Sequence, residues 1–118
     1  MSIDRIETKI IEVDSFDELK EHLDSSIENI SMVENFEDLS EVNNVKILDS
    51  LSDVIKCFSD DFQFVTDLDG NAMGYDEDLG GYIDMERHVC ELIEDGYIDI
   101  YRYNDDYYGR KYILVHNL

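Results

Sequence analysis

The sequence predicts an α+β fold, a single compact domain in which a small antiparallel β-sheet packs against two or three amphipathic helices. Three observations predict it. The chain has 118 residues, of which 43% are apolar, and this is enough for one core without a metal or disulfide staple. Apolar residues recur at helical spacing in several segments and alternate along the C-terminal end. No Pro-rich, Gly/Ser-rich or repeated stretch divides the chain.

The N-terminal part is predicted to hold a short strand over residues 5–13, followed by a helix from residue 16 to about residue 30. Ser15 and Glu18 fit a capping box, in which the serine oxygen accepts from the Glu18 amide and the glutamate reaches back to the Ser15 amide. The apolar residues of the helix are spaced 3, 4, 4 and 3, which places them on one buried stripe: Phe16, Leu19, Leu23, Ile27 and Ile30.

Shorter helices and strands are predicted in the middle of the chain. Helical turns are expected at residues 36–42, and residues 45–47 are compatible with a strand. A helix is predicted over residues 51–58, with Asp49 or Ser50 as its N-cap.

A hairpin is expected next, because residues 62–68 and 71–75 flank the tight-turn pair Asp69-Gly70. Gly80-Gly81 then interrupts the chain.

The last third predicts a helix over residues 84–95, ended by Gly96 in the left-handed conformation. A final hairpin follows, with strands over residues 97–103 and 111–116 and a loop between them. Its apolar residues are expected to share one face of the sheet: Ile98, Ile100, Ile113 and Val115.

The charge of the chain is strongly negative. Thirty Asp and Glu stand against nine Lys and Arg, a formal net charge of −21, which excludes direct nucleic-acid binding and attraction to an anionic membrane. A basic protein is the expected partner. Cys57 and Cys90 each lie in an apolar segment and are expected to be reduced core residues. No basic leader and no long apolar stretch is present, so a cytoplasmic protein is expected.

No catalytic residue, metal site or cofactor is predicted. A calcium loop starting at Asp69 would place Met73 at position 5 and Gly80 at position 12, where an oxygen ligand and a glutamate are required, so a turn and an acidic loop are favoured. The three histidines have no His or Cys at helical ligand spacing, and no nucleotide or nucleophile motif is present. We therefore expect the protein not to be an enzyme.

The sequence does contain carboxylates that are regularly spaced along two predicted helices. Asp17, Glu21, Asp24 and Glu28 fall within an arc of about 60° on the predicted helix, and the row would be about 16 Å long. The helix near the C-terminus repeats the arrangement after an acidic run, with Asp76, Glu77, Asp78, Asp84, Glu91 and Asp95. A charge every 5 to 6 Å or so imitates a row of phosphates.

Two interpretations of these rows remain open. Neither Lys nor Arg occurs between Lys20 and Lys46 or between Lys56 and Arg87, although like charges at helical spacing are destabilising. In the first, the acidic rows keep the protein soluble or adapt it to salt. In the second, they are complementary to the basic groove of a DNA-binding protein.

The final hairpin is also rich in tyrosine. Tyr97, Tyr101, Tyr103 and Tyr112 surround the basic residues of its two strands. One interpretation is that the tyrosines pack at the sheet edge while the bases pair with Asp99, Asp105 and Asp106. The other is that these tyrosines form the interface of a homodimer.

The segment Tyr82-Ile-Asp84-Met-Glu86, followed by a helix, Gly96 and a strand pair ending in Tyr112-Ile-Leu-Val-His-Asn117, resembles the closing segment of ArdA-type antirestriction proteins. The likeness covers roughly residues 80–118, and only Tyr82, Asp84 and Glu86 match position by position. It implies an acidic α+β protein of plasmids, transposons or phages that mimics bent DNA, acts as a dimer and blocks type I restriction-modification enzymes.

The sequence thus favours an acidic DNA-mimic inhibitor that occupies the DNA-binding groove of a defence system in the bacterial host cytoplasm. The target would be a type I restriction-modification enzyme or a CRISPR effector. The alternative is an immunity protein or antitoxin that neutralises a basic nuclease, because such a partner also requires a dense acidic surface.

Overall fold

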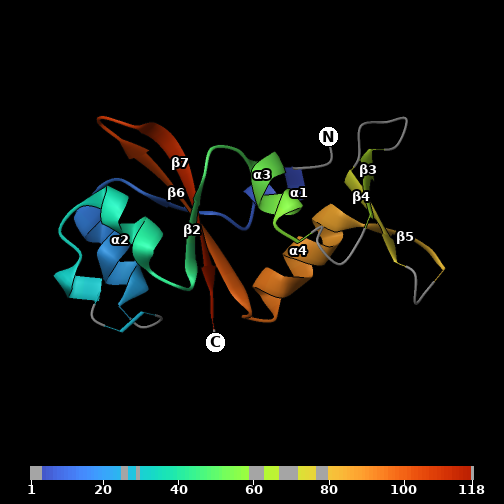
Figure 1. Cartoon of the computed structure of the whole chain (residues 1–118), viewed down its shortest axis with the longest axis horizontal. Helices are drawn as coiled ribbons and strands as arrows, with labels where there is room; N and C mark the ends of the chain where they lie inside the picture. The colour runs from blue at the N-terminus through green and yellow to red at the C-terminus, as the bar shows by residue number, and fades with distance from the viewer. Residues whose placement is uncertain are drawn as a thin grey trace.

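A four-stranded sheet runs through the middle of the molecule and separates two apolar clusters (Figure 1). The computed structural model describes residues 4–24, 27–28, 30–58, 63–66, 72–76 and 80–117. The strand order is β1 (Ile11–Val13), β6 (Ile98–Asp105), β7 (Gly109–His116) and β2 (Val45–Leu48). β1 runs parallel to β6, whereas the other neighbours are antiparallel. The α+β class is confirmed, with one parallel edge strand added to the expected antiparallel sheet.

Both faces of this sheet are buried. In the β6–β7 register Ile100 pairs with Leu114, and Tyr101 pairs with Ile113. Cross-strand partners point to the same face, so these two pairs point to opposite faces. The expectation that Ile98 and Ile100 share a face with Ile113 and Val115 is therefore wrong. The hairpin is apolar on both sides, and only the register decides which side chains meet.

One face is covered by α2 (Phe16–Leu23) and two short 3₁₀ helices, η1 (Ile30–Met32) and η2 (Phe36–Glu41). Their apolar side chains meet the sheet in what we call the α2 cluster. Its buried members are Val13, Leu19, Leu23, Ile27, Ile30, Phe36, Leu39, Val45, Tyr101, Tyr103, Ile113 and Val115. The helical turns expected at residues 36–42 are confirmed, in the 3₁₀ form.

The helix predicted to reach residue 30 ends at Leu23, with Asp24 as its C-cap. Asp, Ser and Asn at positions 24–26 and 29 are weak helix formers. Ile27 and Ile30 are nevertheless buried, and the amide of Ile27 donates to the Leu23 carbonyl at 2.9 Å. At the other end Ser15 Oγ accepts from the Glu18 amide at 3.1 Å, as predicted. The Glu18 carboxylate accepts from the amide of Asp14, one residue before the expected donor.

The opposite face is covered by α1 (Asp4–Glu7), α3 (Leu51–Lys56) and α4 (Met85–Glu94). The buried residues of this α4 cluster are Ile6, Leu51, Val54, Ile55, Met85, Val89, Cys90, Ile98, Ile100, Tyr112 and Leu114. The strand predicted over residues 5–13 is wrong in its first half, because a helical turn carries Ile6 into the α4 cluster. Ser50 and Asp84 cap α3 and α4 through their side chains, and Gly96 follows α4 with a φ of 81°.

A second, three-stranded antiparallel sheet lies beyond α4 and consists of β3 (Gln63–Thr66), β4 (Ala72–Asp76) and β5 (Gly81–Asp84). The hairpin expected here is confirmed in β3 and β4, and its turn at Asp69-Gly70 lies outside the described residues. β5 was not expected from the sequence. The α2 layer and this second sheet occupy opposite ends of a molecule that measures 45 × 27 × 21 Å (Figure 1). Cys57 and Cys90 form no disulfide and pack in the α4 cluster, as predicted.

Candidate functional site

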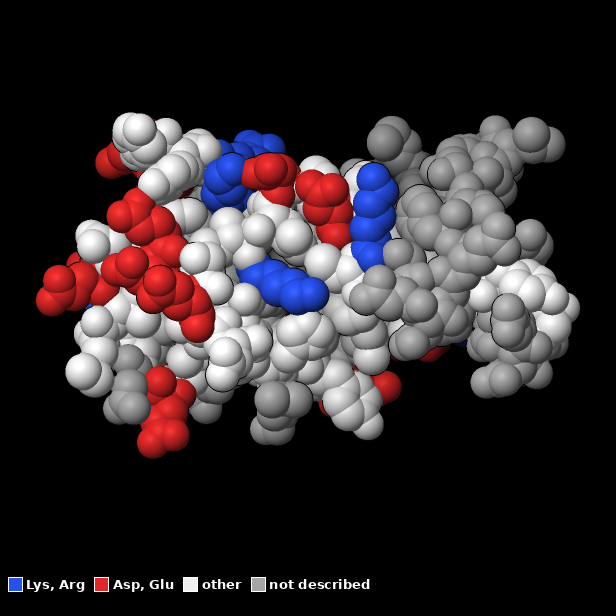
Figure 2. Space-filling view, viewed as in Figure 1, with Lys and Arg blue, Asp and Glu red and all other residues white. Residues whose placement is uncertain are grey.

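The candidate site is the outer surface of the α2 layer, formed by residues 14–41. This segment carries ten acidic residues against a single lysine, Lys20, so its formal charge is −9. We call these ten side chains the acidic layer: Asp14, Asp17, Glu18, Glu21, Asp24, Glu28, Glu34, Glu37, Asp38 and Glu41. All are exposed or half-buried. Figure 2 shows carboxylates gathered over the end of the molecule that holds α2 and η2, whereas most of the Lys and Arg visible on this face lie nearer its middle.

The acidic row predicted on the first helix is only partly regular. Asp17, Glu21 and Asp24 are exposed along α2 and its C-cap, over about 10 Å at 1.5 Å per residue. Glu28 is exposed as well, but it follows the end of the helix and does not continue the row. The expected length of about 16 Å is therefore wrong, because the helix is shorter than its apolar spacing suggested.

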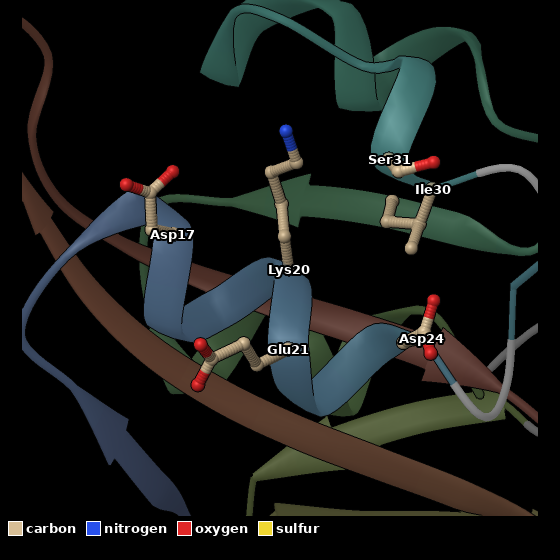
Figure 3. Close-up of a pocket in the computed structure, with 6 residues that line it drawn as sticks. All are labelled: Asp17, Lys20, Glu21, Asp24, Ile30 and Ser31. Carbon is tan, nitrogen blue, oxygen red and sulfur yellow. The ribbon is translucent and has the colours of Figure 1, made fainter.

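Lys20 lies in the middle of this row. Asp17, Glu21 and Asp24 line an open hollow of about 460 Å³ together with Lys20 and with Ile30 and Ser31 of η1 (Figure 3). The Lys20 ammonium lies 5.4 Å from the centre of the Phe16 ring. Among the described residues no ion pair joins Lys20 to a carboxylate, so the row of three carboxylates and one lysine keeps a net negative charge.

On the α4 side, by contrast, acidic residues form ion pairs with Lys and Arg. Lys9 pairs with Glu94 at 2.9 Å, and Arg87 pairs with Glu91 at 3.2 Å. Outside α4, Arg102 pairs with Glu12 and Lys111 with Asp49. Four of the described bases are thus paired with acids outside the acidic layer. Among the described residues, uncompensated negative charge therefore gathers at the end that holds α2.

The second predicted row does not join the first. Asp84 caps α4 by accepting from the Arg87 amide at 3.2 Å, Glu91 pairs with Arg87, and Asp95 is exposed at the C-cap. α2 and α4 cover opposite faces of the central sheet, so their carboxylates do not form one surface. The side chain of Asp76 lies outside the described part of the structure, as do Glu77 and Asp78.

The tyrosines predicted as a dimer interface are mostly internal. Tyr101, Tyr103 and Tyr112 are 4%, 8% and 7% exposed, and only Tyr97, at 61%, lies on the surface. The prediction that these four residues form a dimer interface is therefore wrong, because both faces of the hairpin are covered by the chain's own helices. Burial, with a smaller contribution from Asp99, raises the pKa of Tyr101 to about 12.

The bases of this hairpin do not pair as expected either. Arg102 and Lys111 take Glu12 and Asp49 as partners, so the expected pairs with Asp99, Asp105 and Asp106 are not formed by these two residues. Asp99 instead accepts from the side-chain amide of Asn117 at 2.8 Å.

Sequence reasoning missed six of the ten residues of the acidic layer, namely Asp14, Glu18, Glu34, Glu37, Asp38 and Glu41, of which Glu18 was predicted only as a capping residue. These residues belong to different segments of the chain, so no single helix collects them. The available signal was the long stretch without Lys or Arg between Lys20 and Lys46. The structure turns that stretch into one layer by folding η1 and η2 beside α2.

Other kinds of site find no support in the described residues. They contain no group of three or more His, Cys, Asp or Glu placed to hold a metal ion. They also contain no helix with the length and apolar character needed to cross a membrane. Comparisons of the chain with protein-family models, with curated proteins and with solved structures found no match.

Proposed function

We propose that this protein is a DNA-mimic inhibitor that occupies the DNA-binding groove of a host defence enzyme, a type I restriction-modification enzyme or a CRISPR effector. The observation that carries the proposal is the uncompensated charge of the acidic layer, ten acids and one lysine on a single side of the fold. A surface of this kind attracts a basic groove over a distance of about a Debye length, roughly 8 Å at physiological salt.

The distribution of bases argues that this charge is more than a means of staying soluble. Solubility requires a net charge but not its concentration in one place. Here the bases lie beside carboxylates elsewhere, as in the Lys9–Glu94 and Arg87–Glu91 pairs. Within the acidic layer Asp17, Glu21 and Asp24 follow one another at helical spacing, where like charges are destabilising. Lys20, the one lysine of residues 14–41, forms no ion pair with these three carboxylates among the described residues, so the repulsion is retained, which supports a binding role.

Charge reversal tests this proposal. We expect Asp17→Lys with Glu21→Lys to lose inhibition, while circular dichroism remains unchanged because both side chains are exposed. The matched control is Glu91→Lys with Asp95→Lys, which changes the net charge equally on the opposite face. Inhibition of DNA cleavage by a purified type I restriction enzyme and by a CRISPR effector would be measured with each variant. Equal loss in both variants, or loss in neither, would refute the assignment of the acidic layer.

The same surface supports a second candidate, an immunity protein or antitoxin that neutralises a basic nuclease. The observation that favours it is the short row of carboxylates on α2. Its length of about 10 Å equals the rise of only about three base pairs of DNA. That footprint suits an inhibitor of one small active site. A pull-down from host lysate, eluted with a salt gradient, separates the two functions. Recovery of a single small basic nuclease would replace the first candidate, whereas recovery of a restriction or CRISPR subunit would support it.

A further inference from the structure

The tip of the β6–β7 hairpin exposes two aromatic side chains. Tyr107 is 85% exposed and Tyr108 is 43% exposed, and their ring centres lie 4.8 Å apart in a T-shaped arrangement. The other large apolar side chains that are exposed in the described part of the chain are Met32 and Tyr97. At 85% exposure Tyr107 contributes little to the core, so its place at this tip needs another explanation.

The tip is held in one conformation. The Asp105 carboxylate accepts hydrogen bonds from the amides of Tyr107 and Tyr108, each at 2.9 Å. Gly109 closes the turn with a φ of 77°, a value that favours glycine. Because the turn is already ordered, a partner that binds the aromatic pair would lose little conformational entropy in ordering it.

The tip is also joined to the acidic layer. The Tyr108 hydroxyl donates to the Glu37 carboxylate, and this bond is the main cause of the raised pKa of Tyr108. The ring of Phe36 lies 6.3 Å from that of Tyr108. Figure 1 shows the hairpin tip above η2, at the same end of the molecule as α2. The two tyrosines therefore border the acidic layer.

We propose that this hairpin tip is the aromatic anchor of the acidic layer and binds arginine side chains on the nucleic-acid-binding surface of a basic protein. This inference rests on the proposed function and specifies its chemistry. A guanidinium is planar and weakly hydrated, so it stacks on an aromatic ring while neighbouring carboxylates accept its N–H groups. A lysine ammonium gains less from such a ring. The neighbouring carboxylates are Glu37 and Asp106, and both are exposed.

The two bases beside the tip, Arg110 and Lys111, do not oppose this partner. Lys111 is on the same face as Tyr103 but is paired with Asp49. Arg110 pairs in register with Asn104, so it lies on the face of the hairpin opposite to Tyr103 and the acidic layer. A second copy of this chain is a poor occupant for the same surface, because the acidic layers of two copies would repel each other. Charge complementarity therefore selects a basic protein.

The experiment compares two probes, an oligo-arginine and an oligo-lysine peptide of equal length, titrated against the full chain by calorimetry at low salt. We expect the wild type to bind the arginine peptide more tightly. Tyr107→Ala should weaken arginine binding by about 3-fold to 10-fold and leave lysine binding within about 2-fold. Tyr97→Ala is the matched control, since it removes an exposed tyrosine outside the acidic layer, and it should change neither affinity.

Different failures of this experiment have different meanings. Equal affinity for both peptides, unaltered by Tyr107→Ala, would overturn the aromatic anchor and leave the acidic layer in place. If neither peptide binds, the electrostatic basis of the proposed function fails as well. A concentration-dependent dimer that disappears in Tyr107→Ala would identify a second copy as the occupant and overturn the proposal. Because Tyr107 is 85% exposed, the variant should fold, and a thermal melt would verify this.

Discussion

Neutralising two carboxylates at the C-terminal end of α2 should stabilise the protein. Glu21 follows Asp17 by four residues and precedes Asp24 by three, so it repels both. Asp24 is the C-cap of α2, where the helix dipole disfavours negative charge. Lys20 forms no ion pair with Asp24, so little attraction would be lost. We expect Glu21→Gln with Asp24→Asn to raise the free energy of unfolding by about 0.5 to 1.5 kcal/mol, after allowance for solvent screening.

The assay is urea unfolding followed by far-ultraviolet circular dichroism, at low salt and again at about 1 M salt. At the higher concentration the Debye length falls to about 3 Å, so most of the gain should vanish. In a thermal melt at low salt the variant should unfold about 2 to 6 °C higher. The same variant should bind a basic partner less tightly, which would show that the carboxylates are kept at a cost in stability.

Asp17→Asn is the control within the same helix. Asp17 lies in the first turn, where negative charge is favoured by the dipole, so its neutralisation should bring no gain. The reasoning is refuted if the double variant gains nothing at low salt, if its gain persists at high salt, or if Asp17→Asn stabilises the chain equally.

Two further predictions concern the core and a helix end. Because burial raises the pKa of Tyr101 to about 12, the stability that this residue contributes is intact below about pH 10 and is lost as pH rises through 12. Tyr101→Phe should remove about 2 kcal/mol of that alkaline loss in urea titrations from about pH 9 to pH 12, and an unchanged pH profile would contradict the assignment. Gly96→Ala should cost about 1 to 2 kcal/mol, because Gly96 has a φ of 81° while an added Cβ would meet no atom within 4 Å. Gly81→Ala, whose backbone is not left-handed, should cost clearly less in the same unfolding assay.

The helix starts and one helix stop were predictable because their determinants are local. Ser15, Ser50 and Asp84 each accept a hydrogen bond from the amide three residues later, an interaction that depends only on neighbouring sequence. Gly96 likewise follows α4 where a left-handed residue is needed. The end of α2 was not predictable in this way, since Ile27 and Ile30 keep helical spacing and are buried without belonging to α2.

The assembly of the candidate site depended on long-range contacts. Asp17, Glu21 and Asp24 were found from spacing because they share one helix. Glu37 joins them only because Phe36 and Leu39 bury η2 in the same cluster as α2. The α4 carboxylates lie on the other side of the sheet, which the spacing of charges along each helix cannot show.

The sequence alone determined the α+β class, the net charge and most of the helices and strands, because these follow from composition and local periodicity. The tertiary structure decided which face of the sheet each helix covers, and with it where the charge gathers. The β6–β7 hairpin is apolar on both sides, so alternation cannot assign its faces. Only the register and the packing of distant segments place Tyr101 inside the core and leave the acidic layer exposed at one end.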